Sequence, residues 1–148
     1  MASLRRLNIK SHRYEALYVS RVADHADHLV YVFCCDKRLL YPNGKKSRIA
    51  YIGTTASGVW RLTSSAAERA SQILGRRGVE SFYAYVLTCT PRQRIKTWHK
   101  LERALLLEFR ELFGRVPICN THGRKMKETD EFEYFARPRV IDIIEDLS

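Results

Sequence analysis

The sequence lacks a hydrophobic run long enough to cross a membrane. No segment approaches the roughly 20 apolar residues that a transmembrane helix needs. Residues 1–19 are basic, but they contain no continuous apolar stretch and no small-residue cleavage signature of a secretory signal. We therefore expect an intracellular, cytoplasmic protein with no membrane partner.

Cysteine is also scarce, and its spacing excludes two classes of small domain. Cys34 and Cys35 are adjacent, whereas Cys89 and Cys119 stand alone, which fits neither a zinc ribbon nor a disulfide framework. We expect these cysteines to be core side chains in a reducing compartment. Internal repeats and low-complexity segments are absent as well. A chain of 148 residues is then expected to form one domain around its own hydrophobic core.

Acidic residues are the third shortage. The 16 Asp and Glu are outnumbered by 26 Lys and Arg, which gives a formal net charge of +10. Such an excess favours polyanions through counterion release and electrostatic steering, so nucleic acid is the obvious partner. Many small basic proteins are merely soluble, however, and charge alone does not decide between the two interpretations.

Hydrophobic patterning predicts an α+β fold, a small three-stranded sheet flanked by helices. The predicted strands cover Leu29–Cys35, Arg48–Ile52 and Phe82–Thr90, and the predicted helices cover Ser57–Leu74, about 92–113 and a C-terminal segment opened by Pro138. Pro42-Asn43-Gly44 between the first two strands indicates an antiparallel hairpin. We divide the single domain into residues 1–28, an arm or an extra edge strand over Tyr14–Val22, a core at 29–121, and a C-terminal segment at 122–148 whose helix packs on the core.

The connection of this hairpin is long and basic. Lys45, Lys46 and Arg48 in it are candidates for contact with a phosphate backbone, although a solvated loop would show the same composition. A second polar cluster, Asp24 to His28, has metal-ligand residue types, but a loop before the first strand explains it more economically.

Glu102 is the residue that the helical pattern singles out. At about 100° per residue, it falls inside the apolar arc of the helix at about 92–113. An ionised carboxylate among apolar neighbours needs a metal ion, an arginine or water, because leaving it dry and unpaired costs several kcal/mol. A salt bridge at the rim of the arc is the structural alternative.

Five residues in order resemble the active site of a known nuclease family. Leu29-Val30-Tyr31 stands where that family has Gly-Ile-Tyr, Tyr51-Ile52-Gly53 is a complete second signature, and Arg61, Glu102 and Asn120 follow on suitable elements. The chain thus resembles the GIY-YIG endonucleases over residues 29–121. Each residue taken singly is ordinary, since tyrosines are common in strands and arginines on solvated helices.

The resemblance implies a catalytic site for hydrolysing phosphodiester bonds of double-stranded or branched DNA. Glu102 would hold a single Mg²⁺ or Mn²⁺, and Arg61 would clamp the scissile phosphate. Tyr31 would orient or deprotonate the attacking water, Tyr51 would position it, and Asn120 would secure the nearby backbone. His122, two residues beyond Asn120, is a candidate contact to phosphate or to metal-bound water.

The sequence departs from the family one helical turn after Arg61. Many members have histidine or tyrosine where this chain has Ser65, and no lysine closely follows Tyr51-Ile52-Gly53. We expect a basic residue of the hairpin, Lys45 or Arg48, to substitute. The alternative function is a catalytically weak or inactive nucleic-acid-binding module with the same fold.

Three further properties stay open at this point. A restriction-like, mobile-element or branched-DNA repair role would each suit a compact nuclease of this kind. The chain would associate with the nucleoid when bound to DNA. A homodimer is compatible with the sequence.

Overall fold

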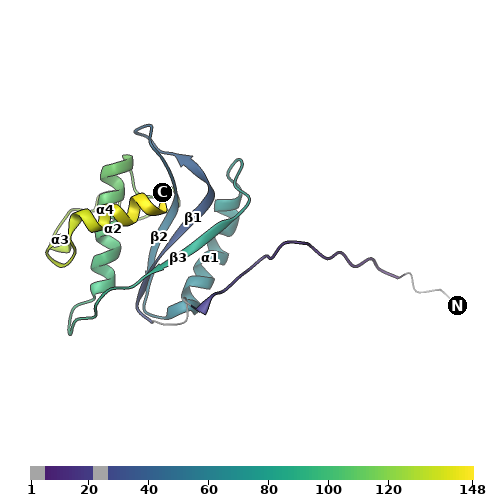
Figure 1. Cartoon of the computed structure of the whole chain (residues 1–148), viewed down its shortest axis with the longest axis horizontal. Helices are drawn as coiled ribbons and strands as arrows, with labels where there is room; N and C mark the ends of the chain where they lie inside the picture. Colours follow the sequence, from purple (N-terminus) through teal and green to yellow (C-terminus); the bar gives the residue numbers. More distant parts are fainter. Residues whose placement is uncertain (1–5, 22–26) are drawn as a thin grey trace.

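The computed structural model describes residues 6–21 and 27–148 and contains one mixed domain (Figure 1). Three strands, β1 (Leu29–Leu40), β2 (Lys46–Thr55) and β3 (Phe82–Leu87), form a sheet in the order β2-β1-β3. Both neighbouring pairs are antiparallel. The helices are α1 (Gly58–Leu74), α2 (Thr97–Phe113), the short α3 (Glu131–Tyr134) and α4 (Arg137–Leu147). The predicted α+β fold is confirmed, and the third strand is antiparallel as well.

The sheet is covered on both faces. Because successive side chains of a strand point to opposite faces, Val30, Val32 and Cys34 of β1 join the core under α2 and α4. Tyr31, Phe33 and Cys35 join the core under α1. The central strand is therefore buried on both sides over residues 29–35, which explains its uninterrupted apolar run.

Several element boundaries differ from the sequence predictions: β2 is longer at both ends, β3 ends at Leu87 rather than Thr90, and two larger differences concern β1 and α2. β1 continues to Leu40, so most of the predicted long loop is a two-stranded ribbon, closed by a turn in which Gly44 has φ 87° and donates to the Tyr41 carbonyl at 3.0 Å. α2 begins at Thr97 rather than near residue 92, because a tight turn pairs Arg92 with Ile95 and holds Arg94 at φ 64°. Neither feature produces a hydrophobic pattern in the sequence from which it could have been predicted.

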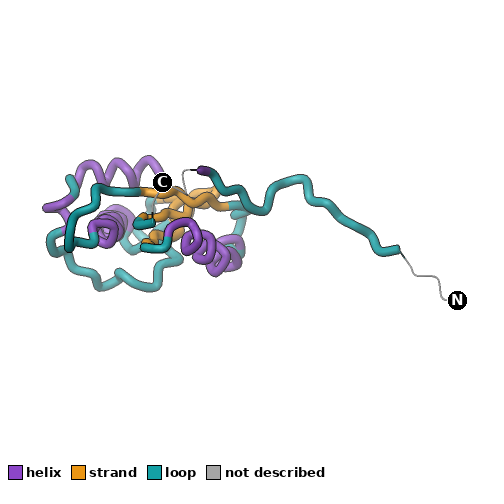
Figure 2. The backbone as a smooth tube through the Cα atoms, turned by 90° about the horizontal axis from the view of Figure 1, so that it is seen from below, coloured by secondary structure: helices purple, strands orange, loops and turns teal. Residues whose placement is uncertain are grey.

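The N-terminal segment extends away from the domain in both views (Figures 1 and 2). Residues 14–21 form no edge strand, and the side chains of Tyr14 and Tyr18 are exposed. The remaining residue of that prediction, Val22, lies outside the described residues, as does most of the Asp24 to His28 cluster. No helix in the described part of the chain is long and apolar enough to cross a membrane.

Candidate active site

Tyr31 and Tyr51 lie side by side on the sheet face that α1 covers. Both are nearly buried, and their ring centroids are 6.1 Å apart. Tyr31 of β1 pairs with Gly53 of β2. A Cβ atom on Gly53 would lie 2.6 Å from Cζ of Tyr31 and 2.6 Å from Cε1 of Tyr51, closer than any real contact. The glycine of the Tyr51-Ile52-Gly53 signature therefore makes room for the two rings.

The environment of Tyr51 keeps its phenol neutral. Burial raises its pKa to about 12, and the neighbouring Tyr31 adds to the rise while Arg69 opposes it. At neutral pH this side chain is a hydrogen-bonding group and holds its proton. That property suits a group that positions water, the role that the family resemblance implies for it.

Glu102 lies on α2 with its side chain only 12% exposed. The Nε2 of His122 lies 3.6 Å from Oε1 of Glu102, and this contact is an ion pair only when the imidazole is protonated. Burial raises the pKa of Glu102 to about 7, and the charge of Arg103 lowers it only in part. Arg103 itself is engaged elsewhere, with Glu131 and the Lys127 carbonyl. A divalent cation would stabilise the ionised form of this carboxylate.

Glu102 is a carboxylate, the type of protein ligand that magnesium takes. Within residues 6–21 and 27–148, no three His, Cys, Asp or Glu side chains are grouped so as to hold a metal ion. Mg²⁺ usually keeps several waters and is bound through one or two carboxylates together with phosphate oxygens. Glu102 as the single protein ligand fits that requirement.

Asn120 is a structural part of the site. Its Oδ1 accepts a hydrogen bond from the Ile52 amide at 3.0 Å, and its Nδ2 donates to the Ile52 carbonyl at 2.8 Å. The adjacent Cys119 amide donates to the Ala50 carbonyl at 2.8 Å. These bonds fasten the loop after α2 to the outer edge of β2, between Tyr51 and Gly53, and so bring His122 to Glu102.

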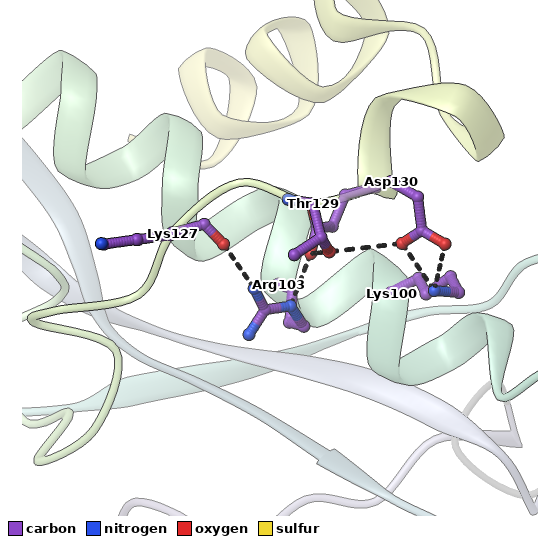
Figure 3. A network of polar contacts seen from close by, with 6 residues as sticks. Lys100, Arg103, Lys127, Thr129 and Asp130 are labelled. Atoms are coloured by element: carbon purple, nitrogen blue, oxygen red, sulfur yellow. Dashed lines mark hydrogen bonds and ion pairs between the residues drawn. The ribbon is translucent and has the colours of Figure 1, made fainter.

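The same loop is fastened to α2 further along the chain (Figure 3). Lys100 Nζ donates to both carboxylate oxygens of Asp130 at 2.7 and 2.8 Å. Arg103 donates to the Lys127 carbonyl at 2.7 Å and to Glu131 at 2.5 Å. Since Asn120 and His122 belong to a loop held at both ends, α2 and β2 determine their positions.

The α1 residues are arranged differently from the sequence expectation. Arg61 is half exposed, and its Nη1 lies 3.5 Å from Glu68 Oε1. The helical pattern of residues 57–74 predicts Ser65 on the face opposite the apolar one, together with Arg61 and Glu68, but Ser65 is fully buried. It accepts a hydrogen bond at 3.1 Å from Nη1 of Arg69, whose guanidinium carbon lies 3.9 Å from the centroid of the Tyr51 ring. Sequence reasoning missed Arg69, although it stands four residues after Ser65, on the same side of the helix.

Arg69 occupies the place expected for a basic residue of the hairpin. Lys45, Lys46 and Arg48 are exposed, and Lys46 stands opposite Leu40 at the far end of the ribbon, whereas Tyr51 stands opposite Phe33. Tyr51 is five residue steps along the strand from Lys46, a distance of about 16 Å. Arg48 lines a hollow near the C-terminus of the chain, which no tyrosine of the pair borders. The expectation that Lys45 or Arg48 substitutes for the missing basic group is wrong.

Comparisons with known proteins add no relative. The chain matches no protein-family model, and no curated protein or solved structure shows significant similarity to it. The resemblance to the GIY-YIG endonucleases therefore rests on the residues described above.

Proposed function

We propose that this chain is a Mg²⁺- or Mn²⁺-dependent endonuclease that hydrolyses phosphodiester bonds of double-stranded or branched DNA. The observation that carries the proposal is the Glu102 carboxyl, which is buried, has the His122 imidazole 3.6 Å away, and adds through its charge to the raised pKa of Tyr51. A buried carboxyl with so little compensation is costly to the fold, and such groups concentrate at functional sites.

The remaining side chains supply what phosphodiester hydrolysis requires. A bound Mg²⁺ would polarise the phosphate and support the leaving oxygen. Arg61 offers a planar, half-exposed guanidinium for the scissile phosphate. Tyr31 and Tyr51 place two phenols together on one sheet face, where they orient the attacking water. The net charge of +10 supports a polyanionic substrate.

A cleavage assay tests the proposal directly. Purified protein is incubated with supercoiled plasmid and with a branched DNA, in Mg²⁺, in Mn²⁺ and in EDTA. We expect cleavage with either metal, no cleavage in EDTA, and none by a Glu102→Gln variant, which keeps the size of the side chain but loses the anionic ligand. DNA binding with no cleavage of either substrate would refute the enzyme and favour the alternative, an inactive nucleic-acid-binding module.

Arg61→Lys adds a second arm to the same assay. Lysine keeps the charge but loses the bidentate geometry that holds a phosphate in line, so we expect a loss of at least about tenfold in the single-turnover rate. An unchanged rate would indicate that Arg61 is an ordinary solvated residue on the surface of α1.

A further inference from the structure

Glu68 on α1 lies between two arginines of the same helix. Its Oε1 is 3.5 Å from Nη1 of Arg61, and its Oε2 is 3.7 Å from Nη1 of Arg69. The two arginines are eight residues apart, about 12 Å along the helix axis. Their side chains therefore converge on one carboxylate from opposite directions along α1.

The two arginines differ in how firmly they are held. Arg69 is 23% exposed and is fixed by Ser65 beneath it and by the Tyr51 ring under its guanidinium. Arg61 is 50% exposed, and Glu68 is its partner in the described part of the chain. One cation is thus preorganised against the tyrosine pair, and the other is free to move toward an anion.

We propose that Arg61 and Arg69 form a two-arginine phosphate clamp and that Glu68 is the internal anion that fills it until a DNA phosphate displaces it. The inference rests on the proposed nuclease function, because it names how that site takes hold of its substrate.

The energetics allow such an exchange. Glu68 is 54% exposed and makes no bidentate contact, so each of its pairs belongs to the weak class of surface ion pairs. A phosphate presents several oxygens to the planar forks of two arginines and forms shorter, charge-assisted hydrogen bonds. Glu68 therefore lowers the affinity for weakly bound anions while yielding to a phosphate that engages both arginines.

Binding of a short fluorescein-labelled DNA duplex in EDTA tests the clamp without any cleavage. We expect Glu68→Gln to tighten binding about two- to fivefold, because it removes a competing anion from the two arginines. We expect Arg69→Gln to weaken binding and to lower the slope of log affinity against log salt by about one. Glu111→Gln on exposed α2 surface and Arg77→Gln after α1 are controls for the loss of one charge.

The double variant Glu68→Gln with Arg69→Gln distinguishes a clamp from a general effect of net charge. If Glu68 occupies both arginines, its substitution gains less affinity once Arg69 is removed, because only its pair with Arg61 then remains to be released. Circular dichroism establishes that each variant is folded. The clamp is overturned if Glu68→Gln tightens binding no more than Glu111→Gln does, if the gain is undiminished in the double variant, or if the wild-type protein does not bind the duplex.

Failure of the clamp and failure of the nuclease give different results. Cleavage of DNA by the wild-type protein with Mg²⁺, without coupling between Glu68 and Arg69, would refute the clamp and support the proposed function. Coupling between Glu68 and Arg69 in the EDTA binding assay, without DNA cleavage by the wild-type protein in Mg²⁺, would support the clamp and refute the nuclease function.

Discussion

Gly53 is the residue on which the geometry of the two tyrosines depends. Its hydrogen-only side chain leaves room for both rings, and a methyl group would lie 2.6 Å from an atom of each. We expect Gly53→Ala to destabilise the protein by about 1–3 kcal/mol, in the range of overpacked cores, and to change the near-ultraviolet circular dichroism of the tyrosines. Urea unfolding measures the first effect. Wild-type stability with an unchanged tyrosine spectrum would show that the rings do not lie over Gly53.

The buried Glu102 carboxyl group, the proposed metal ligand, should also make the stability of the fold depend on pH. Its folded-state pKa of about 7 lies above its ordinary value of 4.5, so the folded state is penalised as pH rises from 4.5 to 7, and the full penalty applies above pH 7. We therefore expect Glu102→Gln to be more stable than the wild type at pH 8, by about 1–3 kcal/mol, and to differ little at pH 4.5. Thermal unfolding at the two pH values measures this difference.

Added Mg²⁺ provides the control for that measurement. Mg²⁺ should stabilise the wild type at pH 8 and leave Glu102→Gln unchanged, because only the carboxylate binds the ion. A variant less stable than the wild type at pH 8 without metal would contradict the burial penalty and indicate that contacts of the ionised Glu102 in the folded state already compensate its burial.

Individual residues show where sequence reasoning succeeds and where it stops. The helical wheel singled out Glu102, because an acid inside an apolar arc is visible without a structure. The wheel of α1 failed for Ser65, since a small polar residue is equally at home in water or buried with a hydrogen-bond partner. That partner is Arg69, whose contact with Tyr51 joins a helix to a strand and leaves no local pattern.

At the scale of elements, the ribbon and the loop after α2 escaped sequence prediction for a common reason. Residues 36–40 continue β1 although four of the five side chains are exposed, and the strand is extended by the pairing of Leu39 and Leu40 with β2 rather than by burial. The loop that carries Asn120 and His122 is likewise ordered by polar bonds to β2 and α2. Hydrophobic periodicity predicts regularly spaced buried side chains, and the few in these segments, such as Val116 and Cys119, follow no regular spacing.

Glu131 makes the anchoring of that loop sensitive to acid. Burial alone would raise its pKa, but hydrogen bonds from Arg103 and Thr129 lower it to about 2. A group whose pKa is lower in the folded state contributes stability above its unfolded value of about 4.5, and this contribution is lost as pH falls toward 2. We expect Glu131→Gln to cost roughly 2–3 kcal/mol at pH 7 and much less near pH 2.

Urea unfolding at pH 7 and at low pH tests this expectation, with Glu133→Gln on the exposed side of the same helix as the matched control. An equal loss of stability at both pH values would show that the Glu131 side chain matters through packing and not through its charge.

At the scale of the whole molecule, the tip of the basic hairpin lies farther along the sheet than the candidate site. The register of β1 and β2 separates Lys46 from Tyr51 by five residues, about 16 Å, which corresponds to about five steps of a DNA strand. The hairpin therefore contacts a substrate only if the DNA continues that far beyond the cleaved bond. We therefore predict that the contribution of the hairpin to DNA affinity depends on the length of the duplex.

Neutralising Lys45, Lys46 and Arg48 together tests that dependence. We expect the triple variant to bind a long duplex more weakly, with the slope of log affinity against log salt reduced by about one for each phosphate that the variant no longer neutralises. A duplex too short to reach from the tyrosines to the hairpin should bind variant and wild type alike.

The single-turnover rate of the triple variant at saturating DNA should also stay close to that of the wild type, because the basic group beside Tyr51 is Arg69 and not a hairpin residue. Equal losses of affinity on short and long duplexes would mean that the hairpin acts only through net charge, and a collapse of the saturated rate would place it at the reacting phosphate.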